Sequence, residues 1–213
     1  MADTAGSSFR MNVIAYPNTD SIDLVWDVVS VCDSPTIFVR KREPAREDEF
    51  KDALYHGFSL TDNIGCAMEA KALLSSSLDE AIGTLQKEFN VKSFLILDRE
   101  GLLLPKEISR CLKAVRSRVS KDSHITYFPN DCFGMGMMNA LYALRLEIDG
   151  LAGSVLGKGC ELSGILDLRK LNHVYQARKR ELFPKRFAGS LDAVFAALFE
   201  DGKGKERFKG EER

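Results

Sequence analysis

The sequence predicts an α/β protein built on parallel strands, and three observations lead to this fold class. Short runs rich in β-branched and aromatic residues alternate with longer stretches whose apolar residues recur at helical spacing. Such alternation implies parallel strands joined by right-handed helical crossovers. The 213 residues are 45% hydrophobic and 29% charged, which is the composition of a globular protein with a sizeable core.

Each element is expected from its own local pattern. Strands are expected at 11–17, 36–41, 56–61, 93–98, 124–129 and 151–157. Helices are expected at 20–32, 46–54, 66–88, 105–119, 133–147, 166–181 and 190–200. Asp20 and Ser21 are candidates for an N-terminal cap, and Pro105 suits a first helical turn. A single domain is expected over 9–200, with flexible termini at 1–8 and 202–213, where the C-terminal residues are polar and rich in charge.

Six strands fit two architectures. An open doubly wound sheet accommodates six strands comfortably in this length. A closed (β/α) barrel usually takes about 250 residues, and about 200 is near its lower limit. Length alone therefore favours the open sheet.

The charge balance, the hydropathy and the cysteine content indicate which partners and which cellular compartment to expect. Lys plus Arg is 30 and Asp plus Glu is 31, so no overall charge draws the chain to nucleic acid or to an anionic membrane. No apolar run approaches the roughly 20 residues of a membrane helix, and the first residues show no secretory signal. Five cysteines without a CxxC pair indicate free thiols in a reducing compartment. A cytoplasmic protein is expected.

Three stretches follow one another in the chain: SFLILDREGLLLPKEI, HITYFPNDCFGMGMMNALYAL and LAGSVLGKGCELSG. Together they resemble one enzyme superfamily, the pyruvate- and acyl-CoA-dependent metallolyases. The first stretch is similar to a strand of that group that ends in Asp-Thr-x-Gly before a Pro and a helix. Asp98, Gly101 and Pro105 match that pattern, and Arg99 stands where Thr is usual. A weaker similarity extends back to HGFSLTDNIG, which is interpreted as the preceding strand.

The other two stretches follow at the spacing of the same superfamily. HITYFPNDCFGMGMMNALYAL resembles the unit His-x-His-Asn-Asp-x-x-Gly and the helix behind it, with matches that include Asn130, Asp131, Gly134 and Asn139. LAGSVLGKGCELSG resembles the next strand and its Gly-rich loop, in which the lyase branch carries a catalytic Cys. Cys160 is the counterpart of that Cys in a loop that is one residue shorter.

The resemblance implies a (β/α) barrel of metallolyase type, truncated or incomplete, with about six recognisable parallel strands. It also implies enzymes that make or break a carbon–carbon bond beside a carbonyl, as hydroxymethylglutaryl-CoA lyase, homocitrate synthase and isopropylmalate synthase do. These enzymes hold a divalent metal with two His and a carboxylate, and the metal stabilises the enolate. Their first strand carries an Arg-Asp or Arg-Glu pair, and VRKREPARED (39–48) has those residue types without that strand context.

The two metal-binding His are replaced here. Tyr127 and Pro129 occupy their places, and neither can act as an imidazole. Side chains alternate along a strand, so 127 and 129 are expected to point into the barrel and His124 to point out toward the helices. No metal ligand is therefore assigned, although the family uses a divalent cation.

The remaining candidates are residues at strand ends and in the Gly-rich loop. Candidate catalytic residues are Asp98, Asn130 and Cys160, and candidate substrate-binding residues are Arg99, Asn139, Gly157, Lys158 and Gly159. Each has a plainer interpretation. Asp98 suits a capping or loop hydrogen bond, Asn130 with Asp131 suits a turn and helix cap, and Cys160 with its glycines suits a tight turn.

Two functions from different classes remain open. The first is a carbon–carbon lyase or synthase that acts on an acyl-CoA or 2-keto acid with a degenerate site. The second is a catalytically inactive homologue, a pseudoenzyme, that binds a ligand or another protein. An incomplete barrel exposes unpaired strand edges, so a second copy or a different partner chain is expected to cover the open edge.

Overall fold

The structure of the chain is a computed structural model that describes residues 12–31, 35–41, 47–74, 78–154 and 164–177. Both predicted termini and the predicted helix at 190–200 lie outside these ranges. The same holds for Gly157, Lys158, Gly159 and Cys160 of the predicted site.

Six parallel strands form one sheet, and their order in space is their order in the chain. The strands are β1 (Asn12–Ala15), β2 (Thr36–Arg40), β3 (Ile64–Glu69), β4 (Ser93–Asp98), β5 (His124–Pro129) and β6 (Gly150–Leu151). A doubly wound sheet reverses its strand order at a switch point, and this sheet does not. The predicted fold class, an incomplete (β/α) barrel of six strands, is thereby confirmed.

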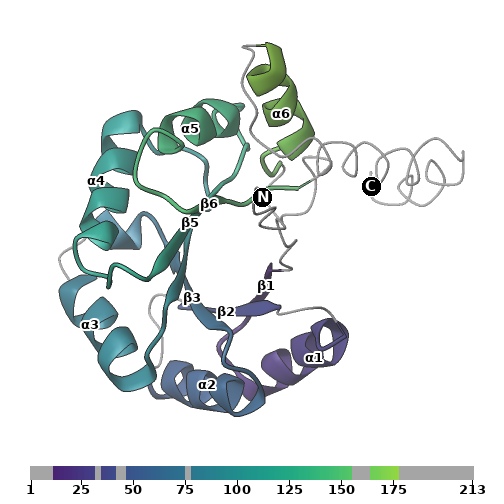
Figure 1. Cartoon of the computed structure of the whole chain (residues 1–213), viewed down its shortest axis with the longest axis vertical. Coiled ribbons are helices and arrows are strands. Elements are labelled where there is room, and N and C mark those ends of the chain that lie inside the picture. The colour runs from purple at the N-terminus through teal and green to yellow at the C-terminus, as the bar shows by residue number, and fades with distance from the viewer. Residues whose placement is uncertain (1–11, 32–34, 42–46, 75–77, 155–163, 178–213) are drawn as a thin grey trace, which may run out of the picture.

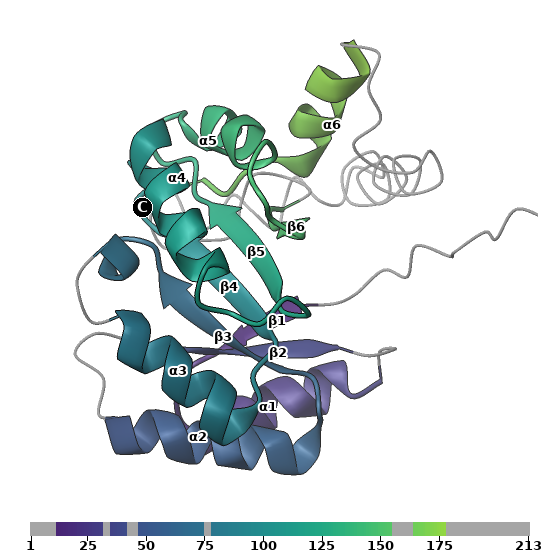
Figure 2. The same cartoon turned by 60° about the vertical axis from the view of Figure 1, so that its left-hand side comes forward.

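The helices lie along the outer side of the curved sheet. They are α1 (Thr19–Val29), α2 (Glu47–Leu60), α3 (Leu78–Phe89), α4 (Pro105–Arg116), α5 (Gly136–Ala143) and α6 (Leu168–Ala177), with a short 3₁₀ turn η1 (Ala72–Leu74). Figure 1 shows the open arc, with β1 and α1 at one end and β6 at the other. Figure 2, turned by 60°, shows α2, α3 and α4 in front of the strands they cover. No helix in the described ranges is long and apolar enough to span a membrane.

Two local assignments from sequence are wrong, and one cap is displaced. Residues 56–61 were expected to form a strand, but residues up to Leu60 continue α2. Phe50, Ala53, Leu54 and Gly57 of α2 are all buried, which is a helical period that extends into this segment. The expected helix 66–88 instead begins with β3, because this strand is buried on both faces and reads as a short apolar run. Asn18, rather than Asp20 or Ser21, caps α1 by accepting from the Ser21 N–H at 2.8 Å.

The two faces of the sheet pack differently. The larger cluster joins strand residues to the helices, for example Ile96 and Tyr127 to Ile108 and Cys111. The smaller cluster contains the inward-facing strand residues Phe38, Ala67, Leu95 and Leu97. Phe128 and Ala152 pack against this cluster. The helix-covered face therefore supplies most of the core, and the concave face carries a narrow apolar strip.

This packing corrects the expected orientation of β5. Tyr127 is 1% exposed and belongs to the cluster on the helix side. Phe128 packs on the concave side, so the alternation along the strand also puts His124 on the concave face. Both were expected the other way round, because the motif alignment fixed the position of each residue but not the face of the strand.

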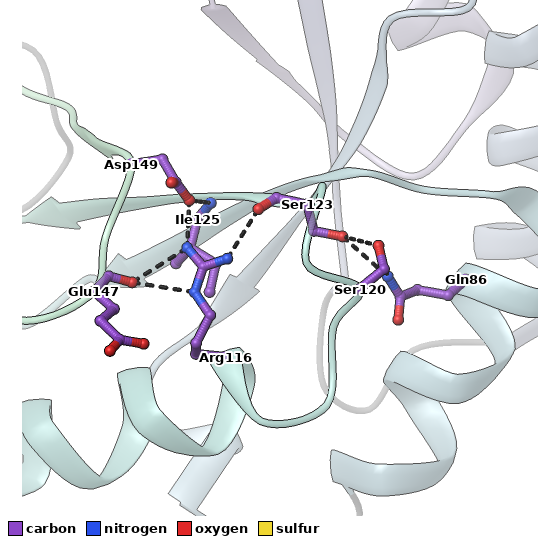
Figure 3. Close-up of polar contacts among 7 residues, drawn as sticks. All are labelled: Gln86, Arg116, Ser120, Ser123, Ile125, Glu147 and Asp149. Carbon is purple, nitrogen blue, oxygen red and sulfur yellow. Dashed lines mark hydrogen bonds and ion pairs between the residues drawn. The ribbon is translucent and has the colours of Figure 1, made fainter.

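The N-terminal ends of β5 and β6 are tied to α4 by one arginine. Arg116 donates to the carbonyl oxygens of Ser123 at 3.0 Å and of Glu147 at 3.2 Å, and it forms an ion pair with Asp149. Asp149 also accepts from the Ile125 N–H at 2.8 Å. Figure 3 shows how the guanidinium joins the helix end to both strands. These contacts at the N-terminal ends of the strands contribute to stability, since the active sites of such barrels lie at the C-terminal ends of the strands.

Candidate functional site

Asp98 ends β4 and is the centre of a buried polar network. Its Oδ2 accepts from the Tyr127 hydroxyl at 3.0 Å and from the Asn139 amide at 3.4 Å. Its Oδ1 accepts from the Gly101 N–H at 3.1 Å. Asp98 and Asn139 are 4% and 1% exposed. The carboxylate is therefore held between β5, α5 and the loop behind β4, by donors that three separate segments supply.

Burial decides the protonation behaviour of this network. Desolvation raises the pKa of Asp98 above its usual range, and the hydrogen bonds from Tyr127, Gly101 and Asn139 partly offset that rise. Burial and the neighbouring Asp98 carboxylate raise the pKa of Tyr127. Cys111, which lies on the same side, has its pKa raised to about 12 by burial and by Asp98. Tyr127 is consequently a neutral donor to Asp98.

Asn130 and Asp131 shape the loop that leaves β5. The Asn130 amide donates to the Arg99 carbonyl oxygen at 2.6 Å, which joins the ends of β4 and β5. Asp131 Oδ1 accepts from the Gly136 N–H at 2.6 Å, at the first residue of α5. The side chains of this pair thus perform the turn and capping roles that were kept open as the plainer interpretation.

An ion pair on the concave face was not foreseen from sequence. Arg40 ends β2, Glu69 ends β3, and the guanidinium lies 2.6 Å from the carboxylate. Arg40 and Glu69 each lie two residues after a member of the concave cluster, Phe38 and Ala67, and therefore on the same face of the sheet. Arg40 Nε is buried without a hydrogen-bond acceptor in the part of the chain that the structure describes. A charged residue at the end of each of two consecutive strands could have indicated this ion pair from the sequence. A helix was expected from residue 66, however, so no strand end was expected at Glu69.

A cavity of about 510 Å³ opens beside the C-terminal ends of β3 and β4. Its charged lining residues are Glu69, Lys71, Asp98, Arg99, Glu100 and Glu107. Several of these charges are paired. Lys71 lies 3.5 Å from Glu100, and Glu107 accepts from the Leu104 N–H at 2.8 Å. The remaining wall is leucine, so the cavity offers an apolar body with charged groups at its rim.

The structure brings some of the predicted site residues together. Asp98, Asn139 and Asn130 converge on the loop after β4, and Arg99 lines the cavity next to them. Asn139 points at Asp98 and is buried. Cys160, Lys158 and the two loop glycines lie outside the described residues, so their relation to Asp98 stays a prediction. Tyr127 was identified as a replaced metal ligand, and its bond to Asp98 was not anticipated.

The residues that the structure describes around Asp98 do not fit the divalent metal that the superfamily uses. All three bonds to Asp98 come from protein donors, Tyr127 is neutral, and Pro129 has no ligand atom. Glu69 already neutralises Arg40. Across the described ranges, no three His, Cys, Asp or Glu side chains lie close enough together to hold a metal ion.

Comparison with characterised sequences gives two relatives of the same description. The chain is 24% identical over 120 residues to a 4-hydroxy-2-oxovalerate aldolase of Pseudoalteromonas translucida, covering 53% of this chain and 35% of that protein. It is 25% identical over 92 residues to 4-hydroxy-2-oxovalerate aldolase 1 of an Azoarcus species, covering 41% and 26%. The chain thus spans about a third or less of these relatives. No protein-family model matches the chain.

Solved structures with the same fold cover most of the chain. The N-terminal domain of a candidate aldolase from Bacteroides vulgatus aligns with a TM-score of 0.69 at 17% identity, over 92% of this chain and 65% of that one. Hydroxymethylglutaryl-CoA lyase from Pseudomonas aeruginosa aligns at 0.63 and 14%, over 93% and 73%. The carboxyl transferase domain of Rhizobium etli pyruvate carboxylase, solved with pyruvate, aligns at 0.61 and 14%, over 79% and 31%.

These similarities agree with the motifs at the ends of β4 and β5. The aldolase relatives and the lyase and carboxyl transferase structures all belong to one superfamily. The chain therefore resembles the pyruvate- and acyl-CoA-dependent metallolyases, and its described residues form an incomplete (β/α) barrel of their type.

Proposed function

We propose that this chain is a carbon–carbon lyase-type protein with a degenerate metal site, which binds a 2-keto acid or acyl ligand at the C-terminal ends of its strands. It does so without metal-dependent turnover. One observation carries the proposal. Asp98, the carboxylate at the strand end, is bonded by Tyr127, Asn139 and Gly101, so it is not presented to the concave face.

The cavity beside β4 supports binding of a small carbonyl compound. Its volume of about 510 Å³ is within the range of small-molecule sites. Lys71 and Arg99 at its rim offer positive charge to a ligand carboxylate, and the leucines offer an apolar wall. The nearby carboxylates Glu69 and Glu100 oppose an anion, so a dissociation constant of about 1 mM is expected, which is a binding free energy of about −4 kcal/mol.

A metal-independent lyase is the rival within the same proposal. It would require Cys160 as an acid or nucleophile beside Asp98 and Asn130, with Arg99 and Lys158 as the groups that stabilise an enolate. Asn139, Gly157 and Gly159 would contribute to substrate binding. Positions at the C-terminal ends of barrel strands suit such a site. The buried bonds of Asp98 favour the binding protein over this enzyme.

The test measures binding and turnover on the same 213-residue chain. Pyruvate and acetyl-CoA are titrated by ligand-observed NMR, while cleavage of 4-hydroxy-2-keto acids and of hydroxymethylglutaryl-CoA is assayed with and without Mg²⁺ or Mn²⁺. We expect saturable binding of at least one ligand and no metal-stimulated cleavage. Arg99→Ala should weaken that binding several-fold, and Lys106→Ala, an exposed lysine on α4 that does not line the cavity, should not.

Three results would contradict the proposal. Cleavage that Mn²⁺ stimulates and that Asp98→Asn abolishes in a folded protein would show a working metal site. Metal-independent cleavage that Cys160→Ala abolishes would establish the rival enzyme. Absence of both binding and turnover, in protein with native circular dichroism, would move the assignment to a protein-interaction module.

A further inference from the structure

An ion pair connects the wall of the cavity to β2. Arg40, at the end of β2, donates from Nη2 to Oε1 of Glu69, at the end of β3, over 2.6 Å. Glu69 lines the cavity, whereas Arg40 does not. In the register of the sheet Arg40 lies opposite Ala67, so its guanidinium reaches two residues along β3, toward the C-terminal edge, to meet Glu69. A ligand in the cavity therefore meets Glu69, and Arg40 acts on that ligand through Glu69.

The charges of the cavity wall are unequal. Among the described residues, its charged lining consists of four carboxylates and two cations: Glu69, Asp98, Glu100, Glu107, Lys71 and Arg99. Glu100 pairs with Lys71 at 3.5 Å, and Glu107 accepts from the Leu104 N–H at 2.8 Å. Asp98 is 4% exposed and accepts from three donors. Carboxylates thus outnumber cations, and a ligand carboxylate enters against that excess unless a cation outside the lining reduces it.

Arg40 is placed to reduce this excess at Glu69. Its side chain is 14% exposed, whereas the side chain of Lys71 is 79% exposed. Water and salt screen an exposed charge strongly and a buried charge weakly, so Arg40 compensates its partner more fully than Lys71 compensates Glu100. On the other side of Glu69, the register partner in β4 is Leu97, which is apolar. The compensating charge at this point of the wall therefore comes from β2.

We infer that Arg40 is a positioning residue that sets the charge preference of the cavity: by holding and neutralising Glu69, it lets the cavity accept a ligand that carries a carboxylate. The inference rests on the proposed binding of a small carbonyl compound in this cavity. Loss of the Arg40 charge leaves Glu69 uncompensated at the wall, which repels a carboxylate but not an uncharged ligand of the same shape. Loss of both charges together returns this part of the wall to neutrality.

Binding of pyruvate and of pyruvamide, its uncharged analogue, tests this role by ligand-observed NMR of the 213-residue chain. Arg40→Gln should weaken pyruvate binding about threefold, the effect of one partly exposed charge, and leave pyruvamide binding unchanged. Glu69→Gln should tighten pyruvate binding by a similar factor. The double variant Arg40→Gln with Glu69→Gln should bind pyruvate as the unaltered chain does. Arg40→Lys keeps the charge and should recover most of the loss.

Lys92→Gln is the matched control. Lys92 also pairs with a carboxylate, Asp122, at 2.7 Å, and it precedes β4 at the end of the strand opposite the cavity. The substitution removes the same charge from the chain, so it should alter the affinity for neither compound. Circular dichroism at the temperature of the titration establishes that each variant is folded.

The outcomes separate this inference from the ligand proposal. Equal weakening of pyruvate and pyruvamide by Arg40→Gln would overturn the inference, because Arg40 would then serve only the packing of β2 against β3. An unchanged pyruvate affinity would also overturn it, and in both cases the proposed ligand site would stand. If the unaltered chain binds neither compound, the inference fails together with the 2-keto acid part of the ligand proposal. If Arg40→Gln does not fold, Glu69→Gln decides: tighter pyruvate binding supports the inference, and unchanged binding overturns it.

Discussion

The Tyr127 hydroxyl lies 3.0 Å from Oδ2 of Asp98, and this bond joins the C-terminal halves of β4 and β5 on the helix-covered face. In the superfamily pattern, position 127 belongs to a metal ligand and position 98 to a functional carboxylate. Here the two side chains satisfy each other within the core. The bond therefore contributes to the packing of β4 against β5, and its contribution can be measured as a change in the free energy of unfolding.

Tyr127→Phe should destabilise the fold at neutral pH. The change keeps the ring and removes one donor from a buried carboxylate, which costs about 2 kcal/mol. Chemical denaturation at pH 7 measures the free energy of unfolding. Tyr142→Phe is the control, since Tyr142 is a half-buried residue of α5 with no hydroxyl hydrogen bond in the described residues. An equal effect of both changes would show that the Asp98 bond contributes nothing.

Asp98 should make the protein less stable as pH rises. Burial raises the pKa of Asp98 in the folded state. At pH values between the unfolded pKa of about 3.9 and the folded pKa, the native state therefore binds more protons than the unfolded state. Unfolding free energy must then fall as pH increases through that window. In Asp98→Asn this fall should disappear, which urea titrations from about pH 3 to pH 8 can follow.

Asp122 provides a control of opposite sign. This exposed carboxylate lies 2.7 Å from Lys92, whose hydrogen bond lowers its pKa to about 2. A lowered folded pKa adds stability above the unfolded value, and that stability is lost as pH falls. Asp122→Asn should therefore slightly lower the free energy of unfolding at neutral pH. If both substitutions changed the pH profile in the same direction, the assignment of the Asp98 shift would be wrong.

Arg116→Ala should loosen the N-terminal ends of β5 and β6. Arg116 holds two backbone carbonyls and Asp149, as Figure 3 shows, so its loss should cost about 1–2 kcal/mol. Amide exchange of Ile125 should increase, because Asp149 would lose the group that positions it. Arg110→Ala removes an exposed arginine from the same helix and should be neutral. Arg116→Lys should recover only part of the loss, since an ammonium cannot bridge all three acceptors at once.

Two glycines should respond in opposite directions to alanine. Gly101 has φ +65°, and a Cβ there would collide with the Asn130 carbonyl. Gly101→Ala should therefore cost at least about 1–2 kcal/mol. Gly83 lies in the interior of α3 with nothing near its Cβ position, so Gly83→Ala should gain about 0.5–1 kcal/mol. Thermal and urea unfolding of both variants measures the difference. A neutral Gly101→Ala would contradict the geometry of the loop after β4.

Much of the architecture follows from local sequence. The runs at 93–98 and 124–129 form β4 and β5 with the predicted bounds, and Pro105 begins α4 as its fixed φ allows. The error at 56–69 has a local cause. Gly65 and Ala67 are weak strand formers, and this segment forms β3 because it pairs with a strand on each side, β2 and β4.

The sequence by itself determined the parallel α/β class, the family resemblance and the loss of two imidazoles, because strand–helix alternation and residue identity are local properties. The face to which each side chain points was decided only by the tertiary structure. Position 127 was expected inside the barrel, yet Tyr127 belongs to the cluster that also contains Ile108 and Cys111 of α4, on the helix-covered face. The Tyr127–Asp98 bond and the Arg40–Glu69 pair each join separate strands. Strand register and packing bring such residues together, and no pattern along one strand contains that information.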